Sequence, residues 1–204
     1  MKLTDVGYKN HSVMKSKTRF TIVDTGTSLS YFSLSDFVQL SNKWLADSSD
    51  VKCFTLTRFY CFSTTDTCSA LAPKLGDVQV RIDDVIYNMP PESYLLPEIN
   101  GVECLIGIFP IEDESGLYIL GDNFIREFYS VFDYENNQVK LALHANARPG
   151  SVIKQGERLK GSLSTMEIIG IVAGSFIALV IVLWCVTKFC GKKDHHTPNV
   201  YSSN

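Results

Sequence analysis

The pattern of apolar and polar residues over the first 147 positions is typical of short β-strands joined by turns. Apolar residues alternate with polar ones over 78–82, which is the period of a strand with one buried face. Continuous apolar runs at 105–109 and 118–120 have the length and composition of buried strands. Two further strand-type segments flank the turn residues 134–137, as in a β-hairpin. We therefore predict a mostly β globular part.

Two short helices are predicted among these strands. Phe37, Leu40 and Trp44 recur at helical spacing after a run of candidate N-cap residues, so an amphipathic helix should extend to Ala46. Asp122 is the candidate N-cap of a second helix, which should run from residue 123 to residue 128. Both helices are short, so the globular part remains mostly β.

The C-terminal part of the chain has a different pattern, because residues 168–187 contain no charged side chain. A helix of these 20 residues would be about 30 Å long, which matches a bilayer core, so we predict one transmembrane α-helix here. The chain then divides into a globular part at 1–147, a juxtamembrane stalk at 148–167, this helix at 168–187, and a cytoplasmic tail at 188–204. Gly170 and Gly174 have the spacing of small residues that pair such helices, as in a transmembrane homodimer.

Composition argues against several classes of partner. The net charge is −3 and no dense stripe of Lys and Arg occurs, so nucleic acid is not an expected partner. No glycine-rich turn leads into a Lys-Ser or Lys-Thr pair, so no phosphate loop is predicted. The cysteines form no Cys-x-x-Cys pair and the four histidines do not cluster with them, so we expect no metal site and no cofactor.

Four cysteines lie in the globular part, and their even number favours two disulfides. Three pairings of Cys53, Cys61, Cys68 and Cys104 are open, although the first two could tie the ends of a hairpin. Disulfides imply an oxidising compartment, so the globular part should be lumenal or extracellular. The sequon that begins at Asn10 is a glycosylation candidate and agrees with that location.

Asp24-Thr25-Gly26 is the strongest candidate for chemistry in the chain. Four residues of strand type lead directly into this tripeptide, so a β-strand should deliver the Asp24 carboxylate onto a tight polar turn. Gly26 allows the backbone to turn closely, while Thr25 and Thr27 place hydroxyl donors beside the carboxylate. The tripeptide by itself is a weak signal, because a plain Asp-Gly type of turn explains it equally well.

Two distant segments resemble the pepsin-like aspartic protease family. Residues 22–28 (Ile-Val-Asp-Thr-Gly-Thr-Ser) look like its second active-site loop, and residues 118–133 closely resemble its near-terminal signature. Residues 75–96 and the placements of Cys68 and Cys104 also resemble the family. The resemblance covers about residues 1–147 and implies the second lobe of a bilobal β fold, with disulfides Cys68–Cys104 and Cys53–Cys61.

The resemblance implies a membrane-anchored endopeptidase that acts on polypeptide substrates. In the family, two β lobes each supply one Asp, and a water held between the two carboxylates attacks the peptide carbonyl. By position, Asp24 would be the second-lobe catalytic Asp, Thr25 would join the hydrogen-bonded neck beneath the dyad, and Thr27 would contact the Asp24 carboxylate. Ile119, Leu120 and Gly121 would form the segment packed under the active-site loop.

The sequence departs from the family pattern in one important respect. It contains no second Asp-Thr-Gly or Asp-Ser-Gly, and no flap hairpin with its tyrosine precedes Asp24. We therefore expect a first lobe, with its own Asp and a signal peptide, to be encoded upstream of Met1. A lone Asp would have an ordinary pKa and little power as a general base.

Two other interpretations remain open. The chain could be a catalytically inactive, membrane-tethered binding or scaffold protein that has kept one lobe, or two copies could assemble a shared dyad. All three place a single-pass type I membrane protein in the secretory or endolysosomal pathway or at the cell surface. The sequence specifies neither the substrate nor the pH optimum nor the organelle.

Overall fold

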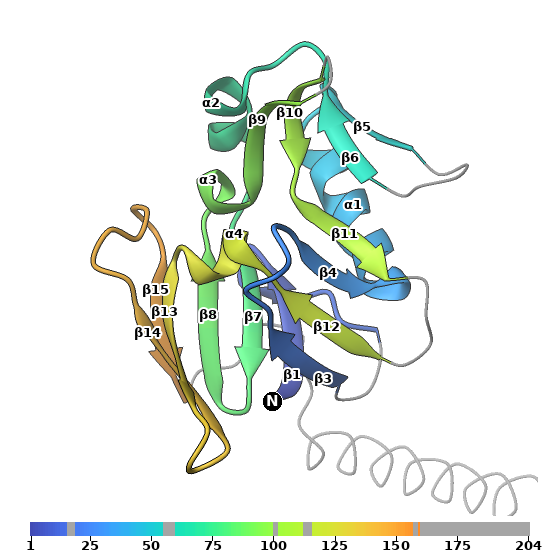
Figure 1. Cartoon of the computed structure of the whole chain (residues 1–204). Coiled ribbons are helices and arrows are strands. Elements are labelled where there is room, and N and C mark those ends of the chain that lie inside the picture. The colour runs from blue at the N-terminus through green and yellow to red at the C-terminus, as the bar shows by residue number, and fades with distance from the viewer. Residues whose placement is uncertain (16–18, 55–59, 100–101, 112–115, 157–158, 160–204) are drawn as a thin grey trace, which may run out of the picture. The chain divides into compact units, whose positions relative to one another are not determined.

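A computed structural model describes residues 1–15, 19–54, 60–99, 102–111, 116–156 and 159. These residues belong to one compact unit, Met1–Ser162, and the second unit, Leu163–Asn204, lies outside the described residues. The described part is mostly β with a few short helices, as the sequence pattern predicts (Figure 1).

Fifteen strands are present in the described residues. Their bounds are β1 (Lys2–Tyr8), β2 (His11–Ser12), β3 (Arg19–Val23), β4 (Ser30–Ser33), β5 (Val51–Phe54), β6 (Tyr60–Ser63), β7 (Val78–Ile82), β8 (Val85–Met89), β9 (Leu95–Ile99), β10 (Val102–Ile106), β11 (Ile108–Ile111), β12 (Leu117–Leu120), β13 (Phe128–Asp133), β14 (Gln138–Leu143) and β15 (Val152–Gln155). The helices are α1 (Leu34–Asp47), α2 (Cys68–Leu71), α3 (Pro91–Tyr94) and α4 (Asp122–Ile125), with a 3₁₀ turn at Ala72–Lys74.

The strands form three sheets. The largest has the order β11-β4-β12-β3-β1-β7-β8-β15, with β2 paired to β1. A second sheet has the order β5-β6-β10-β9, and β13 pairs with β14 as a separate hairpin. Within the largest sheet, β12 is parallel to β3 and antiparallel to β4. Consecutive strands β3 and β4 are thus separated by β12, so the loop between them must cross the end of β12.

Helix α1 packs its predicted apolar face into the core. Phe37, Leu40 and Trp44 are all buried, because their spacing places them on one side of the helix. The Trp44 ring contacts those of Phe37 and Tyr94, with centroid separations of 6.0 and 6.1 Å. Trp44 is therefore a core residue, and α1 packs against β4, β5 and β11.

Asp122 is the first residue of α4, and Gly121 is the N-cap. The sequence pattern predicts Asp122 as the N-cap of a helix over 123–128, and both parts of this prediction were wrong. Asp122 lies inside the helix, and the helix ends at Ile125. Strand β13 begins at Phe128 instead. The ring centroids of Phe128 and Phe124 are 4.7 Å apart. Both aromatic side chains are buried, and this burial favours the end of the helix at Ile125 over a continuation to Phe128.

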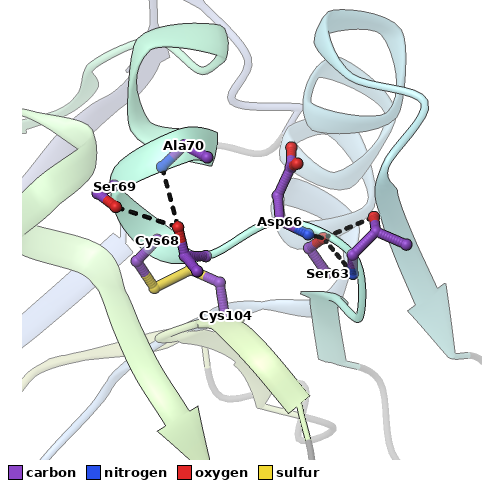
Figure 2. Close-up of a disulfide and its surroundings, with 8 residues drawn as sticks. Ser63, Asp66, Cys68, Ser69, Ala70 and Cys104 are labelled. Carbon is purple, nitrogen blue, oxygen red and sulfur yellow. Dashed lines mark hydrogen bonds between the residues drawn. A yellow bond between two sulfur atoms is a disulfide. The ribbon is translucent and has the colours of Figure 1, made fainter.

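Two disulfides crosslink the sheet that contains β5, β6 and β10, one of them to α2. Cys68–Cys104 joins α2 to β10 across 36 residues, as Figure 2 shows. Cys53–Cys61 joins β5 to β6, where these two residues are directly opposite each other in the ladder. These are the two pairs that the sequence analysis expects, and their presence agrees with a protein of an oxidising compartment.

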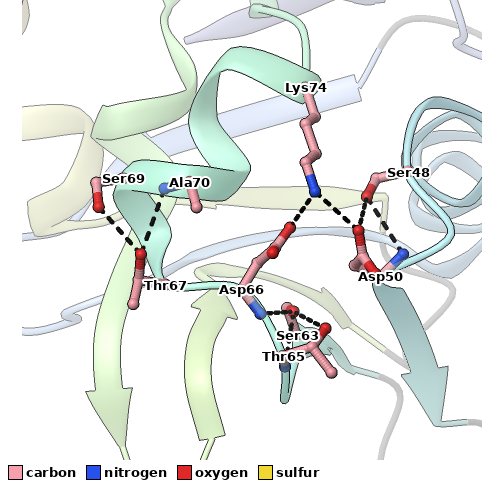
Figure 3. Close-up of polar contacts among 9 residues, drawn as sticks. All are labelled: Ser48, Asp50, Ser63, Thr65, Asp66, Thr67, Ser69, Ala70 and Lys74. Carbon is pink, nitrogen blue, oxygen red and sulfur yellow. Dashed lines mark hydrogen bonds and ion pairs between the residues drawn. The ribbon is translucent and has the colours of Figure 1, made fainter.

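A cluster of polar contacts fixes the segment between the two disulfides (Figure 3). The Lys74 ammonium lies 2.8 Å from Oδ2 of Asp50 and also pairs with Asp66. Ser63 accepts hydrogen bonds from the backbone N–H groups of Thr65 and Asp66. Lys74 thereby links the turn that follows α1, which carries Asp50, to the turn that follows β6, which carries Asp66.

The compact unit extends beyond residue 147, where the sequence analysis expected the stalk to begin. Val152–Gln155 forms strand β15 and pairs with β8 over four residues. Leu159 is also buried, and its methyl groups occupy the space beside Gly7. Residues 148–156 are therefore part of the globular unit, and a polar composition alone did not distinguish an edge strand from a stalk.

Glu127 holds this additional segment in place. Its buried carboxylate accepts hydrogen bonds from the backbone N–H of Arg148 at 2.7 Å and from Oγ of Ser151 at 2.8 Å. The Arg148 guanidinium also pairs with it. Glu127 therefore holds the segment between β14 and β15 through its contacts with Arg148 and Ser151.

The transmembrane helix predicted over 168–187, with Gly170 and Gly174, lies outside the described residues. Within the part of the chain that the structure describes, no helix is long and apolar enough to cross a membrane.

Candidate active site

Asp24 lies directly after the last residue of β3, where the chain leaves the sheet. Its backbone N–H donates to the carbonyl of Leu120 at 3.0 Å, which continues the parallel pairing of β3 with β12 by one residue. The Asp24 carboxylate is therefore attached to a rigid strand end, although it belongs to a loop. This is the position that the strand-to-turn pattern predicts.

The loop supplies donors to both oxygens of the carboxylate. The backbone N–H of Gly26 lies 2.9 Å from Oδ1, and the Thr27 hydroxyl lies 2.5 Å from Oδ2. The Thr27 hydroxyl and then the Gly26 N–H hold the pKa of Asp24 below its ordinary value, because both donors favour the charged form. Asp24 is thus an oriented and ionised carboxylate at neutral pH.

The loop backbone lies against Gly121, at the end of β12. The backbone N–H of Asp122 donates to the carbonyl of Thr27 at 2.8 Å, so the loop is tied to the start of α4. A Cβ atom on Gly121 would lie 2.2 Å from the carbonyl oxygen of Leu29 and 2.3 Å from that of Thr27. Only glycine allows the crossing loop to approach the end of β12 so closely.

The other expected site residues have distinct environments. Leu120 is buried and Ile119 is half-buried, and both lie on β12 next to β3. Thr25 is exposed at the tip of the turn, so its hydroxyl is accessible from outside this unit. Asn10 is exposed in the turn between β1 and β2, at the opposite end of β1 from the strand residues that pair with β3.

Two buried polar networks beside the loop were not found by sequence reasoning. Tyr118 donates to the buried Asp36 carboxylate, which also accepts from the backbone N–H of Lys15 at 2.8 Å. Asn123 accepts from Oγ of Ser30 at 2.7 Å and donates to the carbonyl of Gly107 at 2.7 Å. These contacts join β12 to α1 and α4 to β4. The only sequence signal for them is polar residues inside apolar segments.

An exposed apolar surface lies beside Asp24 on the same strand. Phe20 is 70% exposed and Ile22 is 43% exposed, whereas Thr21 and Val23, which alternate with them on β3, are buried. The β12 residues in register with them, Leu117 and Ile119, are half-buried. Aromatic and aliphatic side chains of this size are mostly buried in folded proteins, so this surface is suited to contact with another protein element.

A cavity of about 850 Å³ adjoins the loop at Ser28 and Leu29. Its other walls come from α4 and β13, including Ile125 and Tyr129, from His144 just after β14, and from Leu96 of β9 and Leu105 of β10. Tyr129 is 58% exposed, so β13 also presents an aromatic side chain to solvent. The Asp24 loop thus follows directly from the strand that carries Phe20 and Ile22 and adjoins this cavity at Ser28 and Leu29.

Within the described ranges, no group of three or more His, Cys, Asp or Glu side chains is placed to hold a metal ion. The one carboxylate that the sequence, the strand end and the hydrogen bonds all single out is Asp24. An oriented carboxylate of this kind can accept a proton from water or bind a proton that is shared with a second carboxylate.

Comparison with known proteins identifies the family of the chain. The family model of eukaryotic aspartyl proteases matches residues 1–144. Plasmepsin I of Plasmodium falciparum is 32% identical over 141 residues, which are 68% of this chain and 28% of that protein. Cathepsin E-A of Xenopus laevis and cathepsin E of Rattus norvegicus are each 38% identical, over 128 and 130 residues, which are 59% of this chain in both cases and 28% and 29% of those proteins. The chain thus spans less than a third of these relatives.

Proposed function

Because the chain belongs to the eukaryotic aspartyl protease family, we propose that it is the second lobe of a membrane-anchored aspartic endopeptidase, with Asp24 as one of two catalytic carboxylates. The observation that carries this proposal is the Asp24 loop itself. Its carboxylate lies on a strand end, is oriented by Gly26 and Thr27, and is flanked by exposed apolar surface. An ordinary surface turn does not require this combination of features.

The chemistry requires a second carboxylate. Two carboxylates that share a site cannot both ionise, so one keeps a proton and the other stays charged; aspartic proteases are the standard example of this splitting. The ionised group takes a proton from water as the water oxygen bonds to the peptide carbonyl carbon. The protonated group donates to the carbonyl oxygen, and the C–N bond then breaks as its nitrogen is protonated.

In this scheme Thr27 and Gly26 donate hydrogen bonds that stabilise the ionised form of Asp24, so Asp24 is suited to be the charged partner of the pair. Thr25, Gly26 and Thr27 are then positioning residues of the loop, and Ile119, Leu120 and Gly121 support the loop from β12.

The second carboxylate would come from a first lobe that packs against the exposed apolar regions. Phe20 and Ile22 border Asp24 on one side, and Tyr129 of the hairpin borders the cavity on the other. Covering such residues is favourable by about 25 cal/mol for each Å² removed from water.

We also propose the membrane arrangement that the sequence predicts. The uncharged run at 168–187 would span the bilayer as one helix, and the disulfides would place residues 1–162 in the secretory or endolysosomal lumen or outside the cell. The tail at 188–204 would be cytoplasmic, and Gly170 and Gly174 would form the contact of any helix dimer.

A peptidase assay of the protein expressed with its upstream coding region tests the proposal. We expect hydrolysis of unstructured polypeptides that a statine-type transition-state mimic inhibits, and no hydrolysis by residues 1–204 alone. If the full-length protein binds peptides but does not cleave them, the tethered scaffold is the better account. Activity of residues 1–204 alone that rises with the square of the concentration would instead indicate a dyad shared between two copies.

A further inference from the structure

We propose that Asn10 carries an N-linked glycan. Asn10-His11-Ser12 is the only Asn-x-Ser/Thr triplet in the 204 residues. The fold and the proposed chemistry of Asp24 make no use of the Asn10 side chain. The inference therefore rests on a separate set of observations and is independent of the proposed protease function.

The backbone presents Asn10 at the tip of a tight hairpin. Tyr8 of β1 pairs with His11 of β2, so Lys9 and Asn10 are the two central residues of the turn. Their φ angles are 51° and 62°, the left-handed values of a type I′ turn, which asparagine tolerates well. The backbone N–H of Asn10 donates to Oε1 of Gln79 at 3.1 Å. The main chain is thus held in place while the residue itself is exposed.

The third residue of the triplet indicates when the sugar is added. In the folded chain Oγ of Ser12 donates to Oδ1 of Asp5 at 2.7 Å, and the backbone N–H of Val6 donates to the same oxygen at 2.8 Å. Because the Asp5 carboxylate is buried, the Ser12 hydroxyl is committed to this contact once the hairpin closes. Transfer of the glycan therefore precedes closure of the hairpin, while the chain is entering the endoplasmic reticulum.

The transfer needs a co-substrate, a lipid diphosphate that carries an oligosaccharide, and a cellular transferase. The Asn10 amide nitrogen bonds to the anomeric carbon of the sugar and loses one proton. The bond from that carbon to the diphosphate oxygen breaks, and the lipid diphosphate leaves with the electron pair. The two disulfides place the chain in the compartment where this reaction takes place.

The position of Asn10 is compatible with an accessible Asp24. Met1 and Thr21 exchange two main-chain hydrogen bonds, so the start of β1 lies beside β3, whose end carries Asp24. Asn10 lies beyond the other end of the seven-residue strand β1, and a strand of that length extends about 23 Å. The glycan would instead cover β2, a two-residue edge strand, and would block further strand pairing there.

Digestion with peptide N-glycosidase tests the proposal. The full chain is directed into the endoplasmic reticulum of cultured eukaryotic cells, and the fraction with a formed Cys68–Cys104 disulfide is collected. We expect digestion in heavy-oxygen water to produce one downward step in apparent mass and an isotope-labelled aspartate at position 10. Ser12→Thr keeps the sequon hydroxyl and should keep the glycan, whereas Asn10→Asp and Ser12→Ala should lose it completely.

Asn146→Asp is the matched control, because Asn146 is also exposed but begins no sequon. It should be glycosylated to the same extent as the natural sequence. A disulfide-bonded chain of natural sequence that shows no mass step overturns the proposal, as does a glycan that persists in Asn10→Asp. Loss of the glycan in Ser12→Ala together with its retention in Ser12→Thr separates the sequon chemistry from a defect in folding.

Discussion

Thr27 donates its hydroxyl hydrogen to Oδ2 of Asp24 across 2.5 Å, from the same loop that crosses the end of β12. The other carboxylate oxygen accepts from the Gly26 backbone at 2.9 Å. One side chain and one backbone group of this chain therefore fix the direction of the Asp24 carboxylate and favour its charged form. This contact yields the first prediction.

Thr27→Val should raise the pKa of Asp24 toward the ordinary value of about 3.9, because valine fills the same space without a hydroxyl donor. Nuclear magnetic resonance titration of the Asp24 carboxyl carbon measures this change. Thr27→Ser keeps the donor and should leave the pKa low. If the Thr27→Val carboxyl titrates as in the natural chain, the Thr27 hydroxyl does not control the charge of Asp24.

The same shift has a consequence for stability. The pKa of Asp24 is lower in the folded state than in the unfolded state, so its ionisation stabilises the fold above the unfolded pKa. This contribution is lost as the pH falls through the folded pKa. Acid titration of unfolding should therefore show a smaller loss of stability below about pH 4 in Thr27→Val than in the natural chain.

Gly121→Ala should destabilise the unit by more than about 3 kcal/mol, because the new Cβ would overlap two backbone carbonyl oxygens that cannot move freely. Denaturant unfolding measures this change. Gly156→Ala is the control, since a Cβ there meets nothing within 4 Å and costs only the left-handed backbone strain of roughly 1–2 kcal/mol. Equal effects of the two substitutions would contradict the close approach of the loop to β12.

Glu127→Gln should release the segment that leads to β15. The neutral amide weakens contacts with the Arg148 backbone, the Arg148 guanidinium and Ser151, and charge-assisted hydrogen bonds contribute roughly 1.5–3 kcal/mol. Amide hydrogen exchange at Val152–Gln155 should accelerate, while exchange in β1 stays slow. Glu135→Gln, on an exposed turn, should change neither. Unchanged exchange in β15 would show that the strand is held by its ladder alone.

Removal of the two disulfides should have unequal effects. By chain entropy the Cys68–Cys104 crosslink, which spans 36 residues, stabilises by about 4 kcal/mol, and the Cys53–Cys61 crosslink, which spans 8, by about 2.5 kcal/mol. Paired Cys→Ser variants compared by denaturant unfolding test this order. Non-reduced peptide mapping is the check on connectivity, and a Cys53–Cys104 peptide would contradict it.

Local patterns in the sequence predicted most of the elements correctly, although they misplaced the start and the end of α4. Strand periodicity, the spacing of Phe37 and Trp44, and the strand that leads into Asp24 all depend on near neighbours in the chain. The carboxylate contacts of Gly26 and Thr27 are also local, because these residues lie two and three positions after Asp24.

Long-range relationships were not predictable in the same way. The need for glycine at position 121 depends on carbonyl groups more than 90 residues earlier, and the Tyr118–Asp36 contact spans 82 residues. Strand β15 contributes only Ile153 to the hydrophobic core, so its composition resembles that of a stalk. It is held mainly by pairing with β8 and by the contacts of Glu127 with the segment that precedes it. Such contacts appear only once the chain has folded.

The most direct test of the central claim is the turnover number of Asp24→Asn in the protein expressed with its upstream coding region. Asparagine is almost isosteric but cannot take a proton from water, so peptide hydrolysis should fall to background while folding and secretion remain close to normal. Asp84→Asn, at a carboxylate whose side chain is 89% exposed, should hydrolyse peptides at the natural rate. If Asp24→Asn retains near-normal hydrolysis, Asp24 is not a catalytic carboxylate and the proposed protease mechanism is wrong.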